Sequence, residues 1–272
     1  MMKSVFALSL ITFKEGIRNR ALFGIVLLAL FLFGLNISVA GFFMRDIGKV
    51  TVDMNLSALT FAGLLLVFFV GVNLMAKDID RKTIHLVLSK PVSRTQYIFG
   101  KYLGIVLFVG VSLLLLLILS SLTILLLLFL YPNYFIGFSW PIFYTACFFI
   151  LIKFSVLSAI IVFFSAITSS SLITLIFSLS SYVAGVTIEE VVFYLRTELA
   201  AQEKIVSESL KNFVEFISYL VPNFSAFDFT LEAAHGLAIT GNRLVFSLSY
   251  GGVYTVILLL FASLIFKRRE FN

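Results

Sequence analysis

The chain has 272 residues, of which 61% are hydrophobic and only 12% are charged, and its formal net charge is +6. A soluble domain carries about 25% charged residues, so this chain lacks the polar surface of a water-soluble fold and its excess apolar surface is expected to face lipid. Lipid offers the backbone no hydrogen bonds, so each crossing must be a helix or part of a closed barrel. The apolar residues form continuous runs rather than alternating ones, which favours helices.

The N-terminal segment 1–20 is predicted to form an amphipathic helix that lies in the membrane interface. Its apolar and basic residues recur at helical spacing on opposite faces, with Phe6, Leu10, Phe13 and Ile17 on one and Lys3, Lys14 and Arg18 on the other. The long apolar run begins only at Ala21, and no small-residue cleavage site follows promptly. The segment is therefore not expected to be a cleaved signal peptide.

Six apolar runs are long enough to cross a membrane, and we interpret residues 1–272 as a single all-α transmembrane domain. The predicted spans are about 21–43, 56–76, 103–130, 142–167, 172–188 and 250–266. The third exceeds the roughly 20 residues that a perpendicular helix needs, so it is expected to tilt or protrude. The turn between the fourth and fifth spans, 168–171, is very short, which predicts an antiparallel hairpin.

Two segments between the spans carry most of the charge. Segment 77–101 is predicted to hold a short amphipathic helix, and segment 189–249 a longer one over about 197–219. With the N-terminus inside, the segments on its side carry about twice as many Lys and Arg residues as the outer segments, as the positive-inside rule requires. We therefore expect a multi-pass protein of the cytoplasmic (inner) membrane, with both termini and 77–101 in the cytoplasm and 189–249 outside.

Motifs for catalysis or nucleotide binding are missing from the sequence. It has no GxxxxGK[ST] phosphate loop, no GxSxG elbow and no HExxH zinc helix. The predicted spans contain no Asp or Glu, whereas an ion-coupled transporter usually holds such a group in the membrane. His85 and His235 fall on opposite sides of the membrane, and Cys147 is the only cysteine. We expect no catalytic, cofactor or metal site in this chain and no nucleic-acid partner.

The segment 77–101 is the most organised polar stretch. Asp80 or Thr83 is suited to cap a short helix, which Pro91 ends, and Ser93 is a candidate N-cap for the helix that runs into the third span. The apolar face of the short helix consists of three residues, Ile84, Val87 and Leu88. From the residues alone, two interpretations stand: an element that transmits a push from a soluble partner into the membrane, or a basic loop held by anionic lipid headgroups.

A sequence pattern runs through this loop into the third span. It is carried by Asp78, Arg81, Lys82, Thr83, Ile84, Leu88, Ser89, Lys90, Pro91, Val92, Ser93, Arg94, Tyr97, Gly100, Lys101, Tyr102, Leu103 and Gly104. The pattern resembles the first cytoplasmic loop of type-2 ABC transporter permeases, particularly the nitrous-oxide-reductase-maturation and sodium-export-like branch. The resemblance extends to 12–20, to the six-span layout and, weakly, to 222–239.

This resemblance implies a function and a set of partners. In that family two permease protomers dock on two ATPase subunits through a coupling helix, and the permease itself has no nucleotide site. We therefore expect an export permease that forms a homo- or heterodimer, with ATP and Mg²⁺ bound by the partner ATPase. The ATPase contact would map to Arg81, Lys82, Thr83, Ile84, Val87, Leu88, Pro91 and Arg94. The alternative is a membrane anchor or assembly scaffold that recruits soluble partners without transport.

A stripe of small residues follows the fifth span. Thr174, Ser178, Ser181 and Gly185 recur at helical spacing, and such stripes let helix backbones approach closely. One interpretation is packing against another span of the same chain. The other is the interface between two permease protomers, which in the family involves the first and fifth spans.

Lys153 is the only charged residue inside a predicted span, where a charge costs about 2.5–3.5 kcal/mol on insertion scales. It is expected either to contact an anionic group on the substrate path or to bond carbonyls and hydroxyls of neighbouring helices. His235 and the acidic outer segment suggest either a site for a periplasmic accessory protein or a solvated cap. The mostly apolar spans suit a lipidic or amphiphilic cargo without requiring one.

Overall fold

The computed structural model describes residues 2–40, 42, 46–80, 92–196 and 208–269. Throughout these residues the regular structure is helical, and six helices are long and apolar enough to cross a membrane. The all-α fold class with six spans is thereby confirmed.

The helices follow the chain in this order: α1 (Met2–Ile17), α2 (Arg20–Ala40), α3 (Ile47–Leu65), the π-helical segment η1 (Leu66–Gly71), α4 (Val72–Asp80), α6 (Arg94–Leu130), the 3-10 turn η2 (Pro132–Tyr134), α7 (Trp140–Ile167), α8 (Ser171–Arg196), α10 (Glu208–Leu220), the 3-10 turn η3 (Ser225–Phe227), α11 (Thr230–His235) and α12 (Gly241–Arg268). From α3 through η1 and into the first turn of α4 the chain is one continuous spanning helix, Ile47–Met75.

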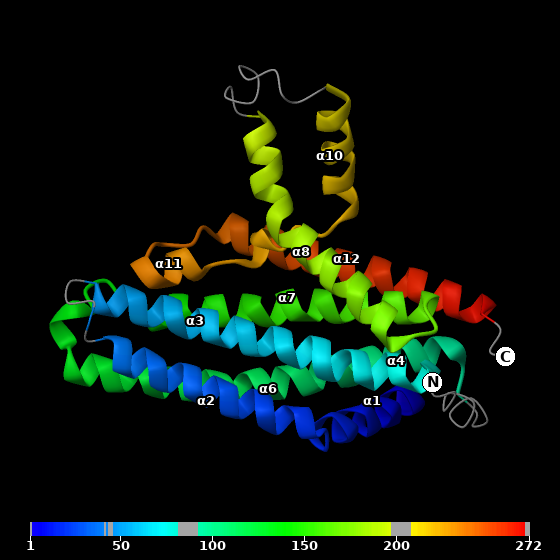
Figure 1. Cartoon of the computed structure of the whole chain (residues 1–272), viewed down its shortest axis with the longest axis horizontal. Coiled ribbons are helices and arrows are strands. Elements are labelled where there is room, and N and C mark those ends of the chain that lie inside the picture. Colours follow the sequence, from blue (N-terminus) through cyan, green and yellow to red (C-terminus); the bar gives the residue numbers. More distant parts are fainter. Residues whose placement is uncertain (1, 41, 43–45, 81–91, 197–207, 270–272) are drawn as a thin grey trace.

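The long helices run side by side along the longest axis of the molecule (Figure 1). Both termini, the end of α4 and the start of α6 lie at one end of this bundle, which we call the terminal end. The short helix α11 lies toward the other end, which we call the opposite end. The last part of α8 and helix α10 form a hairpin that projects sideways from the bundle.

The centre of the bundle is formed by α7 and by the spanning helix Ile47–Met75. In each, 67% of the most apolar window is buried, against 22% for α2 and α8 and 17% for α12. The helices α2, α8 and α12 therefore form the periphery, where their exposed apolar side chains suit contact with lipid or with another membrane subunit.

Helix α1 packs closely along the start of α6 because α6 carries glycine there. A Cβ atom built on Gly104 would lie 2.5 Å from Cβ of Thr12 and 2.8 Å from the carbonyl oxygen of Ser9. On Gly100 it would lie 2.8 Å from a methyl group of Leu8. These two glycines let the backbones of α1 and α6 approach more closely than larger residues allow.

Several spanning helices are longer than the apolar runs in the sequence. The second begins at Ile47, nine residues before the predicted start at 56, and therefore carries Lys49 and Asp53. The expectation that no acidic residue lies on a spanning helix is wrong in this respect. The last spanning helix likewise begins at Gly241 rather than at 250. The extra turns are amphipathic, so a hydropathy run ends before the helix does.

Candidate coupling site and the pocket at the opposite end

Most of the predicted ATPase-contact residues fall within 81–91 and lie outside the described residues: Arg81, Lys82, Thr83, Ile84, Val87, Leu88 and Pro91. The chain is described again from Val92, and Ser93 caps α6 as predicted. The Ser93 hydroxyl accepts a hydrogen bond from the Gln96 N–H at 3.2 Å, and the Gln96 side-chain oxygen accepts one from the Ser93 N–H at 2.9 Å. This reciprocal capping box fixes where the helix begins.

Arg94, the one predicted contact residue that is described, binds the end of α12. Its guanidinium donates to the carbonyl oxygens of Phe266 at 3.2 Å and Lys267 at 3.0 Å, and also to that of Arg269. The last carbonyls of a helix have no partner within the helix, so Arg94 satisfies them and joins the start of α6 to the end of α12.

Arg269 makes the corresponding connection to α7. Its guanidinium donates to the carbonyl oxygens of Ser165 at 3.1 Å and Ala166 at 2.9 Å, and to the Ser169 hydroxyl at 2.8 Å. Partial burial lowers the pKa of Arg269, but a guanidinium remains charged at any physiological pH. Together the two arginines hold α6, α7 and α12 in one arrangement at the terminal end.

A buried ionic cluster lies at the same end, between α1, α4 and α6. Lys101 is only 3% exposed, and its ammonium lies 2.6 Å from the Asp78 carboxylate and 3.7 Å from that of Glu15. It also donates to the carbonyl oxygen of Leu74 at 2.7 Å, while the Tyr97 hydroxyl donates to Asp78 at 3.2 Å. We call Lys101, Asp78, Glu15 and Tyr97 the Lys101 cluster.

The Lys101 cluster was not anticipated from the sequence. In the sequence, Lys101 and Asp78 are only parts of the loop pattern. A signal was present: Glu15 and Asp78 are acidic residues in two predominantly basic segments that were predicted to lie on the same side of the membrane. Removing one partner of a buried ion pair costs about 3–5 kcal/mol, so the cluster holds its three helices firmly together.

Lys153 lies in the middle of α7 and is 7% exposed. Its ammonium lies 5.5 Å from the centroid of the Tyr182 ring on α8, in a cation–π arrangement. The carboxylate of Asp228, from the segment before α11, also acts electrostatically on it. Among the described residues the ammonium has no hydrogen-bond acceptor. The groups that interact favourably with its charge are therefore the Tyr182 ring and, from outside the spans, the Asp228 carboxylate. Its role on a substrate path stays a prediction.

The small-residue stripe on α8 contacts other parts of the same chain. Thr174 and Ser178 are fully buried, and the Thr174 hydroxyl lies 2.6 Å from that of Thr168. A Cβ atom on Gly185 would lie 2.3 Å from the carbonyl oxygen of Pro222, so glycine permits this approach. Ser181 is half-buried. The part of α8 that carries the stripe also exposes large apolar residues: Leu172, Ile173, Ile176, Phe177, Leu179 and Val183.

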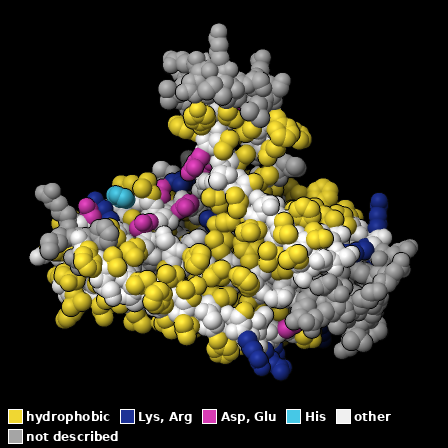
Figure 2. All heavy atoms as spheres, in the orientation of Figure 1, with side chains coloured by type: hydrophobic (Ala, Val, Ile, Leu, Met, Phe, Trp, Pro, Cys, Tyr) yellow, Lys and Arg dark blue, Asp and Glu magenta, His cyan; other side chains and the backbone are white. Residues whose placement is uncertain are grey.

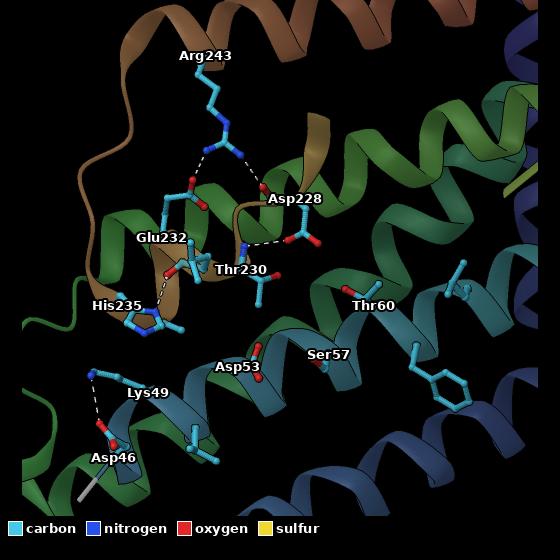
Figure 3. A pocket seen from close by; sticks show the side chains of 15 residues that line it. Asp46, Lys49, Asp53, Ser57, Thr60, Asp228, Thr230, Glu232, His235 and Arg243 are labelled. Atoms are coloured by element: carbon cyan, nitrogen blue, oxygen red, sulfur yellow. Dashed lines mark hydrogen bonds and ion pairs between the residues drawn. The ribbon is translucent and has the colours of Figure 1, made fainter. Parts of the chain in front are cut away.

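A pocket of about 990 Å³ lies toward the opposite end, between α3, α11 and the start of α12 (Figure 3). We call it the α3–α11 pocket. Figure 2 shows acidic, basic and histidine side chains gathered around this hollow, on a face that is otherwise mostly hydrophobic. Its polar lining residues are Asp46, Lys49, Asp53, Ser57, Thr60, Asp228, Thr230, Glu232, His235 and Arg243.

Two ion pairs neutralise most of the charge in the pocket. Lys49 lies 3.1 Å from Asp46, and Arg243 pairs with Glu232. Arg243 also donates to the carbonyl oxygen of Asp228 at 3.0 Å, while the Asp228 carboxylate accepts from the Thr230 N–H at 2.9 Å. Within the described part of the chain no three His, Cys, Asp or Glu side chains are grouped as metal ligands.

Six long apolar helices define a multi-pass membrane protein. A model of the ABC-2 family transporter proteins matches residues 7–271, so the chain belongs to that family, as the loop pattern indicated. Membership makes the chain the permease subunit of an ABC transporter, which works with ABC ATPase partners. A search of curated proteins found no match. The particular branch of the family stays a prediction.

Proposed function

We propose that this chain is the permease of an exporter in the cytoplasmic membrane. Two protomers form the path for the substrate, and separate ATPase subunits bind ATP and Mg²⁺ on the cytoplasmic side. The chain itself carries out no chemical reaction. Both of its termini and segment 77–101 lie in the cytoplasm.

The distribution of charge supports this orientation. Basic residues lie on the helix ends that meet at the terminal end: α12 has Lys267 and Arg268 in its last turn, and α1, which begins there, carries Lys3 in its first turn. Basic residues are retained on the cytoplasmic side of a membrane during insertion. Helix α4 ends and α6 begins at this end, so both points at which segment 81–91 joins the described chain lie where a cytoplasmic ATPase would approach.

The Lys101 cluster is the observation that carries the proposal. It joins α4 and α6, the two helices that flank segment 81–91, and it also joins α1 to them through Glu15. A displacement of that segment by an ATPase would reach three helices together, because the buried ion pair resists their separation. Through Arg94 the same movement would reach α12.

The coupling role is tested by co-expression with an ABC ATPase encoded beside the gene. Replacing Ile84, Val87 and Leu88 together by Ser is expected to abolish co-purification of the ATPase, because the apolar face of the predicted coupling helix is lost. A matched control replaces three exposed apolar residues at the opposite end, Tyr131, Tyr134 and Ile136, by Ser. Undiminished co-purification of the loop variant would contradict the assignment.

Transport itself is tested with the purified complex. A permease is expected to respond to its cargo by a change in ATP hydrolysis, so candidate ligands are screened for stimulation of the wild-type complex. The Lys101→Met variant should bind ATPase but lose that stimulation, since the cluster links the loop to the spans. A complex that hydrolyses ATP without responding to any ligand, and that behaves identically with Lys101→Met, would favour the scaffold.

A further inference from the structure

The polarity of the residues that line the α3–α11 pocket changes along one face of a single helix, α3. The lining residues along α3 recur at helical spacing: the N-cap Asp46, then Lys49, Val50 and Asp53, then Ser57 and Thr60, and finally Phe61 and Leu64. At 1.5 Å per residue, the stretch from Asp53 to Leu64 covers about 16 Å, close to half of the roughly 30 Å hydrocarbon core. The lining thus passes from charged to hydroxyl to apolar over about one leaflet.

The two ion pairs leave two carboxylates of the pocket outside any ion pair, Asp53 and Asp228. Asp46 and Glu232 have basic partners, and Asp228 accepts the Thr230 N–H and acts on Lys153. No described side chain lies within ion-pair distance of Asp53, whose side chain is exposed. Figure 3 shows Asp53 on α3 between Lys49 and Ser57, on the side of the helix that faces the pocket. A negative charge therefore remains at the level where the polar part of the pocket begins to give way to the apolar part.

The apolar part is also open. The side chain of Phe61 is 48% exposed although it lies within a spanning helix whose most apolar window is 67% buried. A cavity of a few hundred to about 1,000 Å³ with an apolar wall and a few convergent polar groups is the usual form of a small-molecule site. The arrangement here suits a molecule with a charged head and an apolar tail.

We propose that the α3–α11 pocket binds a cationic amphiphile, with Asp53 as the counter-ion of its ammonium head and Phe61 and Leu64 along its tail. The hydroxyl groups of Ser57 and Thr60 lie between the two parts and suit the polar neck of such a molecule. The inference rests on the proposed function and names the class of its substrate. An anionic amphiphile is disfavoured, because Lys49 and Arg243 are already paired while Asp53 is not.

The electrostatic part of the proposal is tested by labelling a cysteine in the pocket. Ser57→Cys is purified as the full chain in a maltoside detergent and modified with trimethylammonium-ethyl or sulfonato-ethyl methanethiosulfonate, which differ in charge. The cationic reagent is expected to react faster, and Asp53→Asn should lower the ratio of the two rates about tenfold, since a charge one helical turn away is removed. Asn242→Cys, exposed beside the pocket but not lining it, is the control. The native Cys147 is buried and sets the background.

The ligand part is tested by protection of Ser57→Cys from modification. Dodecyltrimethylammonium, added as a small fraction of the detergent, is expected to slow labelling severalfold, whereas dodecanol and dodecanoate should not. Asn242→Cys should be unaffected by all three. Equal protection by the three compounds, or none by the cation, would overturn the proposal, and this assay decides even if Asp53→Asn fails to accumulate. Because neither assay uses an ATPase, their failure is distinguishable from failure of the coupling proposal.

Discussion

The two ends of the bundle use charge in opposite ways. At the terminal end, the Lys101 side chain is 4% exposed, and its ammonium lies near a carbonyl and the carboxylates of Asp78 and Glu15, whose side chains are 20% and 49% exposed. At the opposite end, the Lys49–Asp46 pair has side chains that are 49% and 58% exposed, and Asp53 has no described partner. Buried, fully paired charge fixes helices relative to one another, whereas exposed and partly paired charge leaves a site free to receive a ligand. The comparison separates the part that transmits motion from the part that contacts cargo.

Replacing a lysine by methionine at each end tests this comparison most directly, and the larger effect is expected for Lys101→Met at the terminal end. It removes the buried ammonium that lies 2.6 Å from the Asp78 carboxylate, so we expect a loss of about 3–5 kcal/mol of stability. Thermal unfolding of the purified chain, followed by size-exclusion chromatography, measures the effect. Adding Asp78→Asn should restore part of the loss, because the carboxylate that faced the Lys101 ammonium is then neutral as well. A Lys101→Met protein with the midpoint of the wild type would show that the cluster does not hold the helices.

Gly104→Ala tests whether α1 belongs to the same rigid unit. The new methyl group would meet Thr12 and the Ser9 carbonyl at less than ordinary contact distance, so overpacking should cost about 1–3 kcal/mol. The expected result is a lower unfolding midpoint together with faster proteolysis of α1. Gly110→Ala on the same helix is the control, since its nearest neighbour would lie at 3.6 Å. If the two variants had the same unfolding midpoint and the same rate of α1 proteolysis, the close packing of α1 on α6 would not contribute to stability.

Ser93→Ala sharpens the view of where α6 begins. The variant loses the hydrogen bond from the Gln96 N–H to the Ser93 hydroxyl, which is expected to lower the stability by about 1 kcal/mol. Hydrogen exchange should increase at the backbone N–H of Gln96, whose acceptor is the Ser93 hydroxyl. Ser249→Ala, at an exposed position on α12, should leave both stability and exchange unchanged. Exchange at Gln96 that does not respond would mean that the cap is dispensable.

Lys49→Met completes the comparison and should have the smallest effect on stability. An exposed ion pair contributes about 0–1 kcal/mol, so the unfolding midpoint should barely move. The measurement is the same thermal assay used for Lys101→Met. If Lys49→Met lowered the unfolding midpoint as much as Lys101→Met does, ion pairs would stabilise both ends of the bundle. The proposed difference between a structural end and a ligand-binding end would then be wrong.

The sequence predicted the features that depend on local composition. Long apolar runs located six spans, Ser93 identified the start of a helix, and the loop pattern indicated the family. These succeed because hydropathy, capping and a contiguous motif are each readable within a few turns of chain. The stripe Thr174, Ser178 and Gly185 was recognised as a place of close approach, although the residues that approach it, such as Pro222, were not.

Features that depend on partners distant in the chain were missed. Lys101 finds Glu15 and Asp78 only after three helices have packed, and Lys153 meets the charge of Asp228 only because the segment before α11 folds back toward α7. The start of α3 was placed too late for a related reason. Lys49 and Asp53 end the apolar run, but a pocket allows polar residues to remain on a spanning helix.

The π-helical segment η1 lies between Asp53 and Asp78 on one continuous stretch of helix. A π-bulge adds a residue to a turn without breaking the helix, and such bulges are frequent at functional sites. If it migrated by one residue along the chain, each residue it passed would rotate by about 100° around the axis. Residues on either side of the bulge would keep their orientation, so Asp53 would still face the pocket and Asp78 would still face Lys101. The segment η1 therefore allows buried side chains in the middle of this helix, such as Val67 and Phe68, to be rearranged while the charged groups at both of its ends stay in place.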